Sequence, residues 1–155
     1  MSFFSKFNRD KLRTLKVGDE MYSLRIPEKY LWEYEDGDIL AFYPKGRETI
    51  TIRVAVLNFE RKDAKSGDFI NTVIEEAESK KSVYQHLDEE TLLVENLPNV
   101  QKENDTDLIM QIWYVAKNNS LVVFTTTVIL SHVNDPTVLE TKRDLDEIFR
   151  SVTKL

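Results

Sequence analysis

The stretch that decides the fold lies at residues 107–130 and reads DLIMQIWYVAKNNSLVVFTTTVIL. β-Branched and aromatic residues, which are enriched in strands, dominate it on both sides of the pair Asn118-Asn119. Because asparagine tolerates positive φ angles, this pair predicts the tight turn of a β-hairpin. We therefore expect two long antiparallel strands, Asp107–Lys117 and Ser120–Leu130.

Both of these predicted strands are apolar on both faces. Successive side chains of a strand point to opposite sides of the sheet, so Ile112 and Trp113 would face in opposite directions. A strand with one face in water would alternate apolar and polar residues instead. The hairpin is therefore predicted to lie at the centre of a sheet, with helices covering both faces.

Four further strands are predicted before the hairpin, as an antiparallel meander. The first covers residues 21–26 and ends at Pro27, because proline cannot donate to a β-ladder. Strands at 30–34 and 39–43 flank an Asp-Gly turn, which is a strong hairpin signal. Residues 48–59 contain the alternation of apolar and polar side chains that is typical of a strand.

The N-terminal segment has the pattern of an amphipathic helix over residues 3–15, which Gly18 would stop. Phe3, Phe4 and Phe7 fall on one half of a helical wheel, whereas most of the basic residues fall on the other half. Three roles stay open for this segment: packing against the domain's own sheet, docking to a partner, or lying on a membrane surface, which is the least favoured.

Two more helices are predicted, one over residues 68–80 and one that begins at Asp135-Pro136 or one turn later, with an apolar stripe from Val138 to Val152. Each carries an apolar stripe opposite a charged face. Between the first of them and the hairpin, residues 91–95 and 100–103 have weaker strand signals.

Together these elements predict a single α+β domain over residues 1–155, with an N-terminal helix at 1–18 and a body at 20–155. The sheet would be twisted and mainly antiparallel, with about six or seven strands, and helices on both faces would make it an αβα sandwich. A length of 155 residues suits one domain with its own core.

Charge is distributed unevenly along the chain. Residues 1–16 carry five basic side chains and one acid, whereas the other 139 residues carry 16 basic and 26 acidic side chains. An acidic body repels nucleic-acid phosphates and is compatible with docking a basic protein. The sequence has no cysteine, which excludes disulfides and thiolate chemistry. Without a secretory signal in the sequence, a cytoplasmic location is expected.

Candidate catalytic and metal-binding groups are sparse. His86 lies close to Asp88 in the sequence, but one imidazole beside adjacent carboxylates lacks the ligand spacing of a metal site. Ser131, His132 and Asp135 would form a triad only by convergence in space, and no nucleophile-elbow motif is present. We therefore predict no catalytic residue, no metal and no cofactor, and a protein that is not an enzyme.

Aromatic residues are denser in the hairpin at 30–43 than a one-sided core requires. Some of them are expected to reach the surface, where Trp and Tyr favour contacts with other proteins. We predict a partner-binding surface made of two groups of aromatic residues, Trp32 and Tyr34 in this hairpin and Phe3, Phe4 and Phe7 in the N-terminal segment.

The order of the elements, with several specific residues, resembles the PsbP-like fold group. The shared features are an early strand that ends in Leu24-Arg25-Ile26-Pro27, an aromatic strand with Trp32, a long strand at 50–59, a two-faced hairpin at 109–127 and a closing helix with Ile148-Phe149. The group includes the PsbP subunit of photosystem II, the Ran-binding Mog proteins and bacterial families of unknown function, to which this chain looks closest. The resemblance covers residues 20–155 and implies an αβα sandwich that acts as a small binding or accessory module.

Two functions stay open at this point. The first is a non-enzymatic protein-binding or accessory module, and a bacterial immunity-type protein is one version of it by analogy of class. The second is a small-ligand-binding protein or enzyme with a pocket between the sheet and a helix. The sequence names neither the partner nor the oligomeric state.

Overall fold

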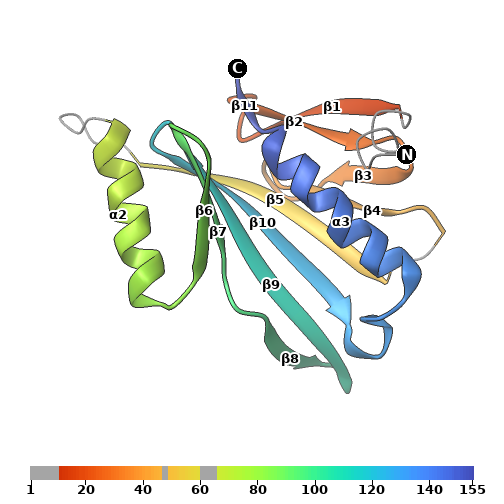
Figure 1. The fold of residues 1–155 in the computed structure, drawn as a ribbon. Coiled ribbons are helices and arrows are strands. Elements are labelled where there is room, and N and C mark those ends of the chain that lie inside the picture. Colours follow the sequence, from red (N-terminus) through yellow and green to blue (C-terminus); the bar gives the residue numbers. More distant parts are fainter. Residues whose placement is uncertain (1–10, 47–48, 60–65) are drawn as a thin grey trace, which may run out of the picture.

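The computed structural model describes residues 11–46, 49–59 and 66–155, and Figure 1 shows the fold. Within these residues the fold is α+β, as predicted, with two sheets and two α-helices. The elements are β1 (Leu12–Val17), β2 (Tyr22–Pro27), β3 (Tyr30–Tyr34), β4 (Leu40–Pro44), β5 (Ile50–Asn58), α2 (Ser66–Ser79), β6 (Val83–Asp88), β7 (Thr91–Glu95), β8 (Asn99–Glu103), β9 (Thr106–Lys117), β10 (Ser120–Ile129), a short 3-10 helix (Leu130–His132), α3 (Pro136–Arg150) and β11 (Thr153–Lys154).

The large sheet is antiparallel and has eight strands. Seven of them follow the order β3-β4-β5-β10-β9-β7-β6, and β8 pairs with the first half of β9. The predicted hairpin of β9 and β10 is confirmed, and both strands have neighbours on either side. Its turn consists of Asn118 and Asn119, whose φ angles of 50° and 59° are the positive values that the pair predicts.

A small sheet of three strands, ordered β1-β2-β11, lies beside the large one (Figure 1). The helix predicted over residues 3–15 is wrong where the structure describes it, because residues 12–15 belong to β1. Leu15 and Val17 are buried while Lys16 between them is exposed, which is the period of a strand. The ladder to β2 overrides the helical pattern, since it satisfies the backbone groups of both strands.

The remaining predictions between residues 82 and 106 have mixed outcomes. The two weak strand signals are confirmed as β7 and β8. β6 was not predicted. It is an edge strand that pairs only with β7, and its side chains are mostly exposed, so it carries little hydrophobic pattern.

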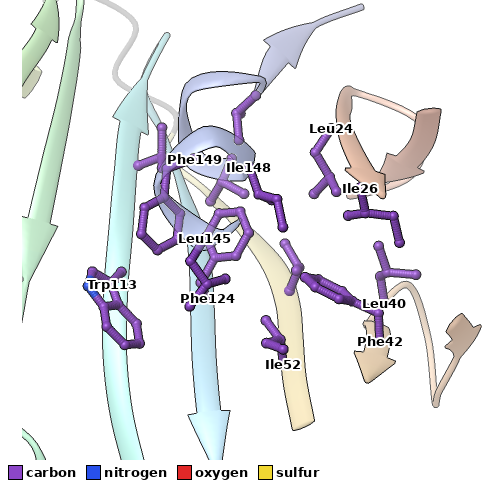
Figure 2. Close-up of a cluster of buried hydrophobic side chains, with 14 of the residues drawn as sticks. Leu24, Ile26, Leu40, Phe42, Ile52, Trp113, Phe124, Leu145, Ile148 and Phe149 are labelled. Carbon is purple, nitrogen blue, oxygen red and sulfur yellow. The ribbon is translucent and has the colours of Figure 1, made fainter. Parts of the chain in front are cut away.

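One face of the large sheet is closed by α3 together with the small sheet. Figure 2 shows side chains of α3 gathered with Trp113 and Phe124 of the large sheet and with Leu24 of the small one. Phe149 of α3 lies edge-on to Phe124, with ring centroids 4.8 Å apart, and 5.7 Å from Trp113. This face holds the main hydrophobic core.

The opposite face is covered at one end only. Ala116 of β9 belongs to a second cluster with Phe69 and Ala77 of α2, whereas its neighbour Val115 belongs to the main core. Successive residues of a strand point to opposite faces, so α2 and α3 lie on different sides of β9. Beyond the reach of α2, alternate side chains of β10 such as Val123 remain half-exposed. The αβα sandwich expected from the sequence is therefore not confirmed, because within the described residues the helices leave part of this face uncovered.

Candidate functional site

The aromatic pair Trp32 and Tyr34 lies on β3, which is an edge strand of the large sheet. The two residues are two positions apart and so share one face of the strand. Their rings meet edge-to-face with centroids 5.7 Å apart. Trp32 is half-buried against the main core, whereas Tyr34 is 47% exposed. Of the five predicted contact residues, these two are adjacent, while Phe3, Phe4 and Phe7 lie outside the described residues.

Strand β1 holds the aromatic pair in place from the small sheet. The Tyr34 hydroxyl donates a hydrogen bond of 2.6 Å to the backbone carbonyl of Lys16. The Arg13 guanidinium lies 5.9 Å from the centre of the Trp32 ring, within the range of a cation–π contact. The pair therefore joins the two sheets and has a fixed orientation at the surface.

An acidic groove of about 420 Å³ lies next to Tyr34, between the β1–β2 turn and the β3–β4 turn. Its walls include the side of β1, with Lys16, and three carboxyl groups, those of Asp19, Glu20 and Asp38. We call Asp19, Glu20, Tyr34 and Asp38 together the acidic groove.

The β1–β2 turn presents its acidic residues through an uncommon backbone. Gly18, Asp19 and Glu20 have φ angles of 63°, 54° and 63°. These lie in the left-handed region, which residues other than Gly, Asn and Asp rarely adopt. A Cβ atom at Gly18 would lie 2.5 Å from a methyl group of Val56, so only glycine fits there. The turn is thus fixed against the large sheet, and it holds Asp19 toward the β3–β4 turn.

Two like charges meet in this groove. A hydrogen bond between the Asp19 and Asp38 side chains raises the pKa of the Asp38 carboxyl, and slight desolvation adds to the effect. Neither carboxyl group forms an ion pair with another residue that the structure describes. Partial burial also raises the pKa of the Tyr34 hydroxyl, and the charges of Glu20 and Asp38 raise it further. A positive group that entered the groove would relieve this repulsion.

The two histidines lie toward opposite ends of β9 and do not meet. His86 is exposed on β6, at the end of β9 that carries Ala116. His132 follows β10 at the other end of β9, and its Nδ1 contacts Asp135 Oδ2 at 2.8 Å. Ser131 makes no hydrogen bond to this pair. Residues 11–46, 49–59 and 66–155 also contain no cluster of three or more histidine or acidic side chains able to hold a metal ion.

The sequence analysis selected Trp32 and Tyr34, whose role in binding stays a prediction, and missed the acidic groove. The Asp-Gly sequence of the β3–β4 turn was interpreted only as a hairpin turn, which it is. Its contact with Asp19 depends on β1 being a strand, and the sequence predicted a helix there. The available signal was a second turn, Gly18-Asp19-Glu20, with the same acidic composition.

Comparisons with known proteins show the fold. No family model and no curated protein matches the sequence. A protein of Bacteroides thetaiotaomicron matches with a TM-score of 0.65 at 14% identity, over 92% of this chain and 48% of the other, so this chain spans about half the length of that protein. The Ran-binding protein Mog1p of Saccharomyces cerevisiae matches with a TM-score of 0.51 at 13% identity, over 94% and 96% of the two chains.

The cyanobacterial PsbP protein CyanoP of Synechocystis sp. also matches, with a TM-score of 0.43 at 9% identity over 94% of each chain. The likeness to the Bacteroides protein and to Mog1p shows that the chain has a Mog1-like fold. No helix within the described residues has both the length and the apolar character needed to cross a membrane.

Proposed function

We propose that this chain is a non-enzymatic protein-binding module whose contact surface is the aromatic pair with the acidic groove. The observation that carries the proposal is the position of Tyr34, a half-exposed aromatic ring beside carboxyl groups that form no ion pair within the described residues. Tyrosine is enriched among the residues that dominate protein interfaces, and complementary charge accelerates and orients docking.

The partner that fits this surface is a protein with an exposed lysine or arginine. Its cation would enter the groove between Asp19 and Asp38, and its neighbouring residues would pack on Tyr34. The fold supports an interaction role of this general kind, since the yeast neighbour is a Ran-binding protein. A bacterial immunity-type protein that binds a basic target in the cytoplasm is one version of the proposal.

The N-terminal phenylalanines belong to the same proposed surface. Arg13 contacts Trp32, and residue 10 precedes Arg13 by three positions. The described residues begin at Lys11, two positions before Arg13, and so begin close to the aromatic pair. We propose that the side chains of Phe3, Phe4 and Phe7 extend the contact area around Trp32 and Tyr34.

A comparative capture experiment tests the proposal. The full chain is immobilised and incubated at low salt with a lysate of its source organism, alongside the variants Tyr34→Ala and Asp19→Asn/Asp38→Asn. The matched control is Asp105→Asn/Asp107→Asn, which removes the same charge from two exposed acids near the β8–β9 turn. Asn is as compatible as Asp with the positive φ of residue 105.

We expect the wild type and the control to retain one stoichiometric partner that both groove variants lose. Because exposed charges are screened by salt, the retained protein should elute as the salt concentration rises. A partner held equally by all four proteins, or no stoichiometric partner at all, would contradict the proposal.

A further inference from the structure

A cavity of about 330 Å³ lies between α2 and the large sheet, on the face opposite the main core. Its volume falls in the range of small-molecule binding sites. Phe59, Phe69 and Tyr114 supply aromatic walls, and Val73, Val94 and Leu121 supply aliphatic ones. The rings of Phe59 and Phe69 are 5.6 Å apart and close one end. This cavity is separate from the acidic groove and shares no residue with it.

The cavity exists because α2 contacts the sheet through a short row of side chains. Phe69, Ile70 and Ala77 are the buried residues of the helix. Ala77 is small, and Val73 one turn before it is only half-buried. The protein therefore leaves apolar walls without apolar partners over this part of the interface, which is unfavourable in water and favours an apolar occupant.

Polar groups also line the cavity, and they include donors. Lys80 Nζ lies 2.9 Å from Glu76 Oε1. The side-chain oxygen of Asn96 already accepts a hydrogen bond of 2.6 Å from the Ser82 hydroxyl. The Asn96 amide hydrogens and the Tyr114 hydroxyl have no hydrogen-bond partner within the described residues. The Asn96 amide and the Tyr114 hydroxyl are thus available as donors at this rim, beside the ion pair of Lys80 and Glu76.

Asn96 is held in position by its own backbone. Its N–H donates to the Ile112 carbonyl at 3.0 Å, and its carbonyl accepts from the Gln111 side chain at 3.0 Å. The amide of its side chain is therefore a fixed donor at the mouth of an apolar cavity. Lys80, by contrast, is exposed and can turn from Glu76 toward a bound oxygen.

We propose that this cavity binds a single-chain amphipathic carboxylic acid with a hydrocarbon chain of about ten carbons. At about 30 Å³ per water-sized group, 330 Å³ accommodates roughly eleven groups, which matches such a chain. The chain fills the apolar walls, and the carboxylate oxygens accept hydrogen bonds from Asn96, Tyr114 and Lys80.

The test is a calorimetric titration of the full chain with decanoate and with decylamine, each below its micelle concentration. The two probes share a hydrocarbon chain and differ in the head group. Non-specific attraction favours decylamine, because the protein carries a net charge of −6. We expect saturable one-to-one binding of decanoate and at least about tenfold weaker binding of decylamine.

Three variants locate the site. For each, the affinity for decanoate is measured, and NMR spectra show which amide chemical shifts change when decanoate is added. Val73→Trp fills the cavity and should abolish binding. Lys80→Gln changes an exposed side chain and therefore retains the fold. It should weaken the binding of decanoate several-fold. Thr125→Trp, on the same sheet face beyond α2, is the matched control and should leave the affinity unchanged.

Several outcomes would overturn the inference. These are no saturable binding of decanoate, binding of decylamine as tight as that of decanoate, or shift changes that fall away from the residues lining the cavity. Vesicles that carry phospholipids with the same chain length distinguish a free acid from a membrane-held acyl chain. Binding to the vesicles in place of decanoate would also overturn the inference.

Discussion

The two faces of the large sheet differ in how completely they are covered. On the α3 face, Val122 and Phe124 of β10 are fully buried. On the other face, Leu121 and Val123 of the same strand are half-exposed. One strand supplies both sets, so the difference comes from what packs above each face. Apolar residues on both sides of a strand therefore indicate that the strand is central in the sheet. They do not show that other elements cover both faces of the sheet completely.

The largest expected effect contrasts two neighbouring residues of β10. Phe124→Ala should lower the free energy of unfolding by about 3–5 kcal/mol, because it leaves a cavity against Phe149. Val123→Ala on the opposite face should lower it by about 1 kcal/mol or less, since this side chain is half-exposed. Urea unfolding followed by circular dichroism measures both. Equal losses at the two positions would break the contrast between the faces.

A hydrogen bond also joins α3 to the large sheet. The buried Tyr30 hydroxyl of β3 donates a hydrogen bond of 2.5 Å to Asp144 Oδ2 of α3. Removing it in Tyr30→Phe should lower the free energy of unfolding by about 1.5–3 kcal/mol, the range for hydrogen bonds to charged groups. Tyr34→Phe, at an exposed hydroxyl, is the matched control and should cost less.

The same contact predicts a dependence on alkaline pH. Burial of Tyr30, together with the hydrogen bond to Asp144, raises the pKa of its hydroxyl. The folded state therefore keeps a proton that the unfolded state loses above about pH 10, so the free energy of unfolding should fall as the pH rises beyond that value. The fall should be smaller in Tyr30→Phe. Identical pH profiles for the two proteins would show that this hydroxyl does not anchor α3.

A smaller effect is expected at the end of α2. Lys81 follows the helix with a φ of 57°, and the Ser82 N–H bonds back to the Ala77 carbonyl at 2.8 Å. Glycine is the preferred residue at such a position, so Lys81→Gly should raise the free energy of unfolding by up to about 1 kcal/mol. Glu75→Gly, in the exposed middle of the helix, should lower it by about 1 kcal/mol. Thermal unfolding of the two variants should shift in opposite directions.

The smallest predicted effect lies in the acidic groove. Because Asp19 raises the pKa of Asp38, the folded state holds a proton more tightly than the unfolded state. The stability of the wild type should therefore decline as the pH rises from about 4 toward neutrality, and Asp38→Asn should remove this decline. The variant should be slightly more stable than the wild type at pH 7 and should lose that advantage in acid. A destabilised variant at pH 7 would mean that Asp38 has a favourable contact.

The strong periodic elements could be predicted because their patterns are long and locally consistent. β9 and β10 have 12 and 10 residues with a turn whose chemistry agrees with them. α3 has its proline at the start and an apolar stripe along its length. The prediction failed at β1 because Leu12 and Leu15 also fit a helical wheel, and only the ladder to β2 decides between helix and strand.

The candidate site could also be predicted only in part from the sequence. The exposure of Tyr34 could be inferred from an excess of aromatic residues in one hairpin. The contact of Asp19 with Asp38 joins two turns that are far apart in the sequence, and the cavity under α2 depends on how close that helix lies to the sheet. Neither distance is encoded in a local pattern.

The affinity of the captured partner for the two charge variants tests the central claim most directly. Calorimetry at low salt compares Asp19→Asn/Asp38→Asn with Asp105→Asn/Asp107→Asn, which carry the same net charge. The account predicts a loss of about tenfold or more for the groove variant and a change within about twofold for the other. Equal losses for both variants would attribute binding to diffuse charge and would contradict a site at the groove.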